Sequence, residues 1–516
     1  MKKMKRIAAA FLAVLMAVSV AACGGSASTA ESASQAGAES AGSTKDTLNI
    51  RIPDGMATLD PCKWTLDSDF RSIYQVYEPL YRVMDDTTEV PMLATAYEIK
   101  DDGLTYVFTL RENVSFSNGD KMTAEDVAFS IMRATESPYL SFYVDMIESA
   151  EPDNEAGTVT LHLSAPSPGL IDGLSYVMVM NKKYTEENID ETGSLGYKTC
   201  GTGPYVVKEA VQDVSVTMEA NPNYWGGTAP IKNLNFRFVT DETQAMNGIL
   251  AGDLNVARLT TPNWEDLKKN SAIQTEELVA NHITYIIINC TKEPFTDKRV
   301  RQALMMATDR EAMVEMVMDG LASPAYTVVT PLMIGATQIE TKYPYDVEKA
   351  KQLLTDAGYP DGLDIEIQSL ADSYFDEAAT VWKEQLAEIG VRANITPLDA
   401  NKLISNGMTL SYDVLTMGQT NSYDMGFINT FFATDQIPDM NMSGFSDPEL
   451  DALLQDAGTD LDPESRKAKY KTILERVDEE CPYIPLFNRL TCVAYSNGLN
   501  YKPQVRNDRF FEASWQ

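Results

Sequence analysis

Two segments of the chain alternate large apolar side chains with smaller or polar ones at a period of two. Residues 47–52 read TLNIRI, and residues 104–110 read LTYVFTL. In an extended chain, alternate side chains point to the same face, so this pattern is typical of a strand that buries one face. Both segments are therefore predicted to be strands.

Helical patterns begin at two places that carry N-terminal capping residues. Thr123 is followed by the acids Glu125 and Asp126, which suit the first turn of a helix because they satisfy free amides and complement the helix dipole. The apolar stripe of this helix is expected at Val127, Ile131 and Ala134. A second helix is predicted over residues 346–358, DVEKAKQLLTDAG, which begins at an Asp and ends at a Gly.

A strand, a helix and a second strand follow one another between residues 364 and 396. The strand DIEIQSL at 364–370 precedes the helical DEAATVWKEQLAEIG, which Gly390 closes, and VRANIT begins at Val391. A helix between two such strands predicts a right-handed crossover and parallel pairing. Strands and helices mixed in this way predict an α/β fold with mixed sheets.

The N-terminal region has the sequence pattern of an export signal. Lysines and an arginine precede an almost wholly apolar run that ends at Ala22, and the run is shorter than a membrane-spanning helix requires. Val20-Ala21-Ala22-Cys23 resembles the bacterial lipoprotein box, so we expect residues 1–22 to be removed and Cys23 to carry a diacylglyceryl anchor. Residues 23–46 are rich in Ser, Ala and Gly and are predicted to be a flexible linker.

The composition of the chain excludes some classes of binding partner. The chain has 516 residues and a formal charge of −33, so nucleic acid is not expected as a partner, because phosphate binding requires a basic surface. After Cys23 the cysteines are odd in number and form no CxxC motif, which indicates neither a disulfide framework nor a metal site. Pairing of Cys481 with Cys492 is left open. Arg299, Arg301 and Arg310 are interpreted as solvated or ion-paired helix residues.

Several segments together resemble one family. The segment from Pro91 to Arg133 is similar to the signature region of the extracytoplasmic solute-binding proteins of family 5, the peptide and nickel binders of ABC importers. Further blocks that resemble the family occur in order along the chain: TLDPCK, GTGPY, NPNYWGG, PFTDKRVRQALMMATDRE, YPYDVEKAKQLLTDAGYP and IPLFN.

The resemblance implies a two-lobed clamp like the periplasmic binding proteins of type II, in their large cluster with an extra subdomain. Lobe I would contain residues 47–85, 200–290 and 485–516, residues 86–199 would form an inserted subdomain of lobe I, and residues 291–484 would form lobe II. A solute enclosed by the lobes would stabilise the closed form. We expect a monomer at the outer face of the cell membrane that delivers its solute to an ABC permease and its ATPase.

The resemblance also places ligand contacts on both lobes. The residues that fall in the family's ligand-contacting segments are Trp64, Thr65, Leu66, Tyr139, Gly418, Gln419, Asn421, Tyr423 and Asp424. Peptide binders of the family show a Trp, two residues and an Asp that holds the amino terminus, whereas Gly418 and Asn421 occupy those positions here. We therefore expect Asp424 to supply the missing charge if the solute is a peptide. Simple turn formation by Asp424 is the alternative.

Other ligands and functions stay open. An oligosaccharide could stack on Trp64, Trp225 or Trp264, and a metal chelate needs few protein ligands, although His162 and His282 are the only histidines. A lipid-anchored hydrolase is the alternative class, but the chain has no GxSxG, HExxH or SxxK motif. We expect no catalytic residues, no cofactor and no bound metal. A sensor that presents its closed form to a receptor would have the same sequence features.

Overall fold

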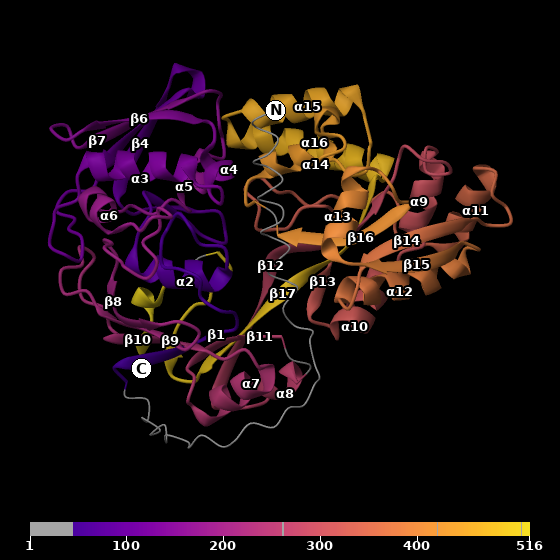
Figure 1. Ribbon diagram of the computed structural model, residues 1–516. Helices are drawn as coiled ribbons and strands as arrows, with labels where there is room; N and C mark the ends of the chain where they lie inside the picture. The colour runs from indigo at the N-terminus through magenta and orange to yellow at the C-terminus, as the bar shows by residue number, and fades with distance from the viewer. Residues whose placement is uncertain (1–44, 261–262, 421, 507) are drawn as a thin grey trace. The chain divides into compact units, whose positions relative to one another are not determined.

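The computed structural model describes residues 45–260, 263–420, 422–506 and 508–516, and these fold into two compact units (Figure 1). Unit 1 contains the described residues up to Ala165, together with Leu170–Leu278 and Thr491–Gln516. Unit 2 contains Pro166–Gly169 and Val279–Leu490. Within the described residues, no helix is long and apolar enough to span a bilayer.

Unit 1 is built around a sheet in which β1 is a central strand. β1 pairs in parallel with β10 and β11, and β10, β9 and β8 continue the sheet with antiparallel pairing. Leu48, Ile50 and Ile52 of β1 are fully buried, as the alternation predicted. The strands of this sheet are β1 (Thr47–Ile52), β8 (Tyr205–Val211), β9 (Ser215–Ala220), β10 (Asn233–Phe238) and β11 (Val256–Leu259).

A second sheet of unit 1 has the order β4-β5-β7-β6. Its strands are β4 (Ala94–Lys100), β5 (Thr105–Leu110), β6 (Ile147–Asp153) and β7 (Thr158–Leu163), and α3 (Ala124–Glu136) packs against β6 and β7. Thr123 caps α3 by accepting a hydrogen bond from the Asp126 amide, and the predicted apolar stripe at Val127, Ile131 and Ala134 is buried. The predicted strand at 104–110 is confirmed except at Leu104, which precedes β5 and is 38% exposed.

The remaining elements of unit 1 are short. Its helices are α2 (Asp67–Val76), α4 (Ser141–Val144), α5 (Leu170–Leu174), α6 (Lys182–Asn188), α7 (Glu242–Ala251) and α8 (Trp264–Lys268), with 3-10 turns η1 (Asp101–Gly103) and η4 (Phe510–Glu512). Two small hairpins pair β2 (Tyr81–Val83) with β3 (Glu89–Pro91) and β18 (Leu499–Asn500) with β19 (Ser514–Trp515).

Unit 2 contains the predicted strand-helix-strand crossover. β14 (Asp364–Leu370) pairs in parallel with β15 (Arg392–Leu398) and with β16 (Val414–Thr420), and α12 (Tyr374–Glu388) lies along all three strands (Figure 1). Trp382 of α12 is fully buried in this core, and its indole N–H donates to Thr308 Oγ1 at 2.9 Å. The predicted helix at 346–358 is α11 (Val347–Asp356), capped by Asp346.

The other elements of unit 2 surround this core. The helices are α9 (Lys298–Met306), α10 (Arg310–Met318), α13 (Ala400–Met408), α14 (Asn429–Phe432), α15 (Pro448–Thr459) and α16 (Pro463–Glu480), with the strand β13 (Ala322–Pro324) and 3-10 turns η2 (Met425–Ile428) and η3 (Thr434–Gln436).

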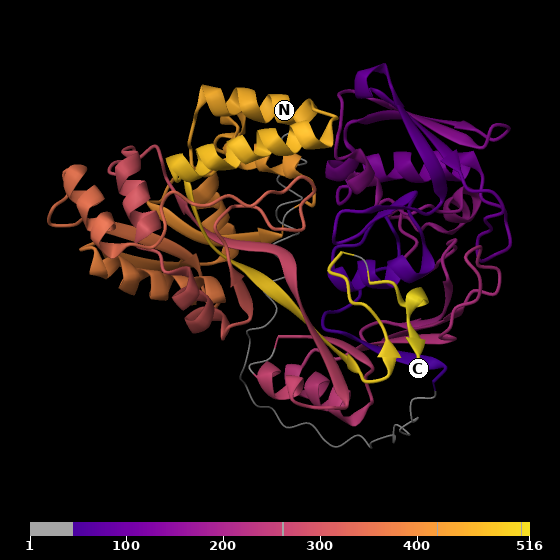
Figure 2. The ribbon, with the colours of Figure 1, turned by 180° about the vertical axis from the view of Figure 1, so that it is seen from behind.

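Two long strands belong to both units. β12 (Ile273–Ile288) and β17 (Tyr483–Ser496) each begin in one unit and end in the other, and they are neighbours in the sheet (Figure 2). In unit 2, β12 pairs with β16 and β17 pairs with β13, whereas in unit 1 β17 pairs with β11. The fold is therefore α/β with mixed sheets, as predicted.

Candidate ligand-binding site

In unit 1, the loop before α2 carries Trp64, Thr65 and Leu66, and a buried carboxylate holds it. Asp69, in the first turn of α2, accepts hydrogen bonds from the amides of Ala57 at 2.8 Å and of Thr65 and Leu66 at 3.3 Å. Burial raises the pKa of the Asp69 carboxyl, although these amides act in the opposite direction. The loop is thus fixed by backbone contacts, which leaves its side chains available for other contacts.

A second buried carboxylate, Asp60, fixes the other end of the same loop. Its two oxygens pair with both terminal nitrogens of Arg133 at 2.8 Å, and they also accept from the amides of Cys62 and Leu195. Burial alone would raise the pKa of Asp60, but the hydrogen bonds and charge of Arg133 outweigh burial and hold that pKa below its usual range. The bidentate geometry is the strong form of an Arg–carboxylate pair.

Aromatic rings surround Trp64. Its ring centroid lies 4.7 Å from that of Phe70 and 6.4 Å from that of Tyr176, and Tyr176 in turn stacks on Tyr143 at 4.5 Å. The indole nitrogen of Trp64 is buried and has no hydrogen-bond partner among the residues that the structure describes. A buried N–H without an acceptor is costly, so this indole is the feature of the loop that its own contacts leave unexplained.

Tyr139 lies on a segment that is tied to the same loop. Ser137 Oγ donates to the Cys62 carbonyl at 2.6 Å and accepts from the Tyr139 amide at 3.2 Å. The Tyr139 side chain is 37% exposed. The structure therefore connects the segments of the predicted contacts Trp64 and Tyr139 through one serine.

The other two tryptophans considered for stacking are engaged within unit 1. Trp264 is 1% exposed and donates to Glu277 at 2.7 Å. The ring of Trp225 is covered by the Arg111 guanidinium at 4.1 Å from its centroid, and its N–H donates to Glu78. Stacking on a sugar requires a free ring face, which the buried Trp264 does not offer and which Arg111 restricts at Trp225.

In unit 2, the end of β16 carries Gly418 and Gln419. A Cβ at Gly418 would lie 2.8 Å from the Ile283 carbonyl oxygen and 2.7 Å from the Phe375 ring, so only glycine allows β12 and α12 to approach this strand. Gln419 is buried and accepts from the Tyr285 hydroxyl at 3.0 Å. Tyr423 is 8% exposed, and Asn421 lies outside the described residues.

The carboxylate of Asp424 is paired within unit 2. Its two oxygens accept from the two terminal nitrogens of Arg466 at 2.7 Å each, and Oδ1 also accepts from the Gly426 amide at 2.7 Å. Arg466 has a buried side chain and packs its guanidinium over the ring of Tyr470. The turn formation considered for Asp424 is therefore present, and its charge is balanced by an arginine that the sequence analysis did not identify.

A group of three side chains near the end of β16 was also missed as a site. His282 on β12 lies opposite Thr420 of β16, and its Nε2 is 2.9 Å from the Tyr374 hydroxyl. The guanidinium carbon of Arg489 lies 5.3 Å from the centroid of the Tyr374 ring. Burial, and secondly the charge of Arg489, lower the pKa of His282 to about 3, so its imidazole is neutral at ordinary pH. The pairing of β12 with β16 places the His282 Nε2 3.0 Å from the position of a Cβ at Gly418.

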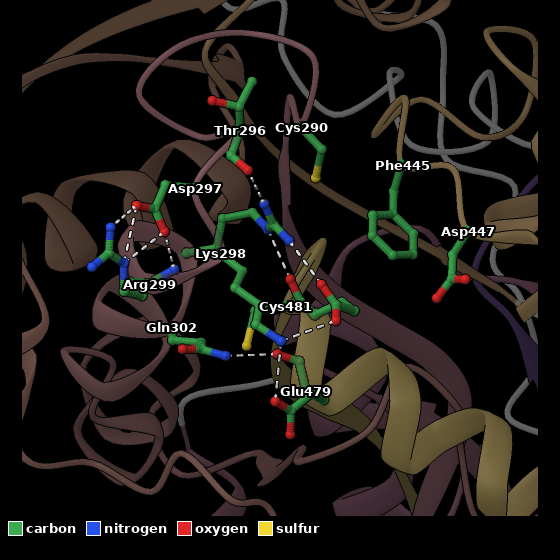
Figure 3. A network of polar contacts seen from close by, with 12 residues as sticks. Cys290, Thr296, Asp297, Lys298, Arg299, Gln302, Phe445, Asp447, Glu479 and Cys481 are labelled. Atoms are coloured by element: carbon green, nitrogen blue, oxygen red, sulfur yellow. Dashed lines mark hydrogen bonds and ion pairs between the residues drawn. The ribbon is translucent and has the colours of Figure 1, made fainter. Parts of the chain in front are cut away.

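Figure 3 shows a network of polar contacts at the start of α9. Lys298 contacts Glu479 and Glu480 at the end of α16, and Gln302 donates to the Glu479 carbonyl at 2.8 Å. Arg301 is buried and donates to the carbonyls of Phe295 and Glu480, both at 2.7 Å. This network joins two helices of unit 2, and it assigns the arginine-rich block to stability.

Candidate metal ligands and thiols are the remaining reactive groups of the described residues. They contain no group of three or more His, Cys, Asp and Glu side chains that could hold a metal ion. Cys481 and Cys492 are buried thiols that are not joined to each other.

Two α/β units linked by two continuous strands, with aromatic and polar side chains on fixed loops, define a two-lobed solute-binding protein. The chain belongs to the bacterial extracellular solute-binding proteins of family 5, whose middle region matches residues 88–439. It is thus an extracytoplasmic solute-binding protein of the kind that serves ABC importers.

Relatives with assigned ligands align over most of the chain. Heme-binding protein A of Haemophilus influenzae is 29% identical over 80% of this chain and 82% of its own length. The glutathione-binding protein GsiB of Salmonella typhimurium is 28% identical over 87% of this chain and 90% of its own length. Di/tripeptide-binding protein 1 of Pseudomonas aeruginosa is 26% identical over 83% of this chain and 86% of its own length. The structure of HbpA2 from Haemophilus parasuis matches with a TM-score of 0.83 and 27% identity, over 91% of this chain and 100% of that one.

Proposed function

We propose that the protein is a lipid-anchored monomer that captures an oligopeptide between its lobes and delivers it to the permease and ATPase of an ABC importer. Two of the relatives named above bind glutathione or di- and tripeptides, which supports a short peptide as the solute. The anchor would be Cys23, which lies outside the described residues.

The observation that carries the proposal is the indole N–H of Trp64, which is buried and has no acceptor among the described residues. It belongs to a loop that Asp60 and Asp69 hold by its backbone, and its ring packs on Phe70, which restricts the indole. A peptide presents carbonyl acceptors at regular spacing, and a preorganised donor binds one at little entropic cost. Thr65, Leu66 and Tyr139 are proposed as its neighbours in contact with the solute.

A thermal-shift screen tests the proposal. The panel contains tripeptides, glutathione, a neutral trisaccharide, a nickel–histidine chelate and heme. A solute at a hundred times its dissociation constant stabilises the folded protein by about 2.7 kcal/mol, so a peptide ligand should raise the melting temperature by several degrees. Trp64→Phe keeps a ring but removes the N–H, and it should reduce the shift. A shift with the trisaccharide or the chelate alone would contradict the proposal.

Oligosaccharide binding is the less supported alternative. Of the three tryptophans considered for stacking, Trp264 is buried and Trp225 is covered by Arg111. Trp64 is then the remaining tryptophan of the three that could stack on a sugar, and its ring already packs on Phe70.

A further inference from the structure

The last part of the chain packs against α2, the helix that follows the loop of Trp64. After β17 the chain stays in unit 1, where its yellow C-terminal segment lies beside α2 (Figure 1). Hydrogen bonds join four residues of this segment to one another, to α2 or to β11. We call these four residues the C-terminal brace: Tyr501, Gln504, Asp508 and Phe510.

Asp508 is the centre of the C-terminal brace. It is 1% exposed, and one carboxylate oxygen accepts from Arg71 of α2 at 2.7 Å and from Arg258 of β11 at 3.1 Å. The other oxygen accepts from the Tyr501 hydroxyl at 2.7 Å and from the Gln504 amide at 3.1 Å. Burial alone would raise the pKa of Asp508, but the charges of Arg258 and Arg71 outweigh burial and hold that pKa below its usual range. Asp508 is therefore ionised at neutral pH.

A second set of contacts joins the backbone of the C-terminal brace to the same helix. Gln75 of α2 is fully buried, and its Nε2 donates to the Asp508 carbonyl at 2.7 Å. Its Oε1 accepts from the Phe510 amide at 3.1 Å. Because Arg71 and Gln75 are four residues apart, they lie on one face of α2. Attachment at two points along this face restricts rotation of the helix as well as its translation.

The position of α2 determines the position of the loop that precedes it. Asp69, in the first turn of α2, accepts hydrogen bonds from the amides of Thr65 and Leu66, both at 3.3 Å. These two residues directly follow Trp64. A displacement of α2 would therefore move the loop or break these hydrogen bonds.

Arg258 makes a second connection between the C-terminal brace and the start of α2. One of its terminal nitrogens lies 3.1 Å from Asp508, and the other lies 3.2 Å from Asp67, the first residue of α2. The same guanidinium also donates to the Gln504 carbonyl at 2.8 Å. Both ends of α2 are thus linked to the last residues of the chain.

We propose that Asp508 is a positioning residue for solute binding, which holds α2 and, through α2, the loop of Trp64. Without the charge of Asp508, the guanidinium groups of Arg71 and Arg258 would lose a buried counter-charge. The loop would then adopt its binding arrangement for a smaller fraction of the time, which weakens binding in proportion. The proposal deepens the proposed function and rests on it for the statement that this loop contacts the solute.

A matched pair of substitutions isolates this role. Asp508→Asn removes the charge with little change in shape. Glu78→Gln is the control, because the buried Glu78 carboxylate also accepts from four groups, one of them Arg509 of the C-terminal segment, and none of the four belongs to α2 or to the loop. Gln75→Met breaks the backbone contacts of the C-terminal brace without changing a charge, and it tests the same link if Asp508→Asn does not fold.

Amide hydrogen exchange measured by mass spectrometry reports on the loop without a ligand. In Asp508→Asn and Gln75→Met, the segment that contains the amides of Thr65 and Leu66 should exchange about tenfold or more faster than in the parent protein. Glu78→Gln should leave this exchange unchanged. Unchanged exchange of the loop in both brace variants, or the same acceleration in Glu78→Gln, would overturn the proposal.

Calorimetry with the peptide that gives the largest thermal shift separates this proposal from the proposed function. Asp508→Asn should weaken binding of that peptide about tenfold, and Glu78→Gln should not weaken it. Equal affinity in Asp508→Asn and the parent protein would overturn the positioning role while peptide capture stands. Faster exchange of the loop in Asp508→Asn, without binding of any peptide to the parent protein, would contradict peptide capture and leave the hold of Asp508 on the loop standing.

Discussion

At the scale of single residues, buried ion pairs hold the loops of the candidate site in position. Asp60 is 0% exposed and its partner Arg133 is 15% exposed, and together they hold the loop that carries Trp64. Removing one member of such a pair leaves the other desolvated and unpaired, which costs more than the pair itself contributes. Asp424 and Arg466 form an equivalent pair in unit 2.

Arg133→Met should lower the free energy of unfolding by about 3–5 kcal/mol at neutral pH, because Asp60 would stay buried without a counter-charge. Since the folded-state pKa of Asp60 is depressed, its pairing contributes stability above the unfolded-state pKa of about 3.9, and this contribution is lost as the pH falls through the folded-state value. The difference between parent and variant should therefore shrink below about pH 4.

Urea unfolding at several pH values measures both effects. Arg237→Met is the control, since Arg237 is exposed and its side chain donates to the Asp253 carbonyl rather than to a buried carboxylate. If Arg133→Met lowered the free energy of unfolding as little as Arg237→Met, the pair of Asp60 and Arg133 would not hold the loop that carries Trp64.

At the scale of elements, close approach of backbones shapes the surface at the end of β16. Gly418 lets β16 lie against Ile283 of β12 and Phe375 of α12. Every residue of β12 from Ile283 to Ile288 is buried, and so are Val414 to Met417 of β16, a pattern typical of strands that are covered on both faces.

Gly418→Ala should destabilise the protein by about 1–3 kcal/mol, because the added methyl group would meet a backbone oxygen that cannot move independently. Gly458→Ala is the matched control: nothing lies within 4 Å of its added Cβ, and alanine is favoured over glycine in the helix α15, so it should be neutral or stabilising. Chemical denaturation of both variants compares them. Equal effects at the two glycines would contradict the packing described for β16.

Local sequence patterns predicted the helices and strands well. The contacts of the candidate site could not be predicted in this way, because they depend on the pairing of segments that are distant in sequence. β1, α3, α11 and the β14-α12-β15 crossover followed from periodicity and capping residues, which act within a few positions. Asp424 meets Arg466, and His282 meets Tyr374, only after strands and helices distant in sequence have packed together. The charge balance of the site was therefore beyond what the sequence could predict.

At the scale of the whole molecule, each unit has its own core, and β12 and β17 run through both. A binder of this class works beside a membrane permease, and a tether raises its local concentration there. The lobe boundaries and the anchor at Cys23 stay predictions.

Cys23→Ser should release the protein from membranes of a bacterial host and abolish incorporation of labelled palmitate, because the thiol is the proposed site of acylation. Membrane fractionation with metabolic labelling measures both outcomes, and Cys290→Ser, which removes another thiol, should change neither. Full retention of label and membrane association in Cys23→Ser would contradict a lipid anchor at this position.

Isothermal titration of the purified protein with the peptide that gives the largest thermal shift tests the central claim most directly. A solute-binding protein should show saturable heat with one peptide bound per chain, and the heat should return to baseline after every injection. Heat that continues after each injection would indicate turnover of the peptide by an enzyme. Absence of saturable binding by any peptide of the panel would contradict peptide capture.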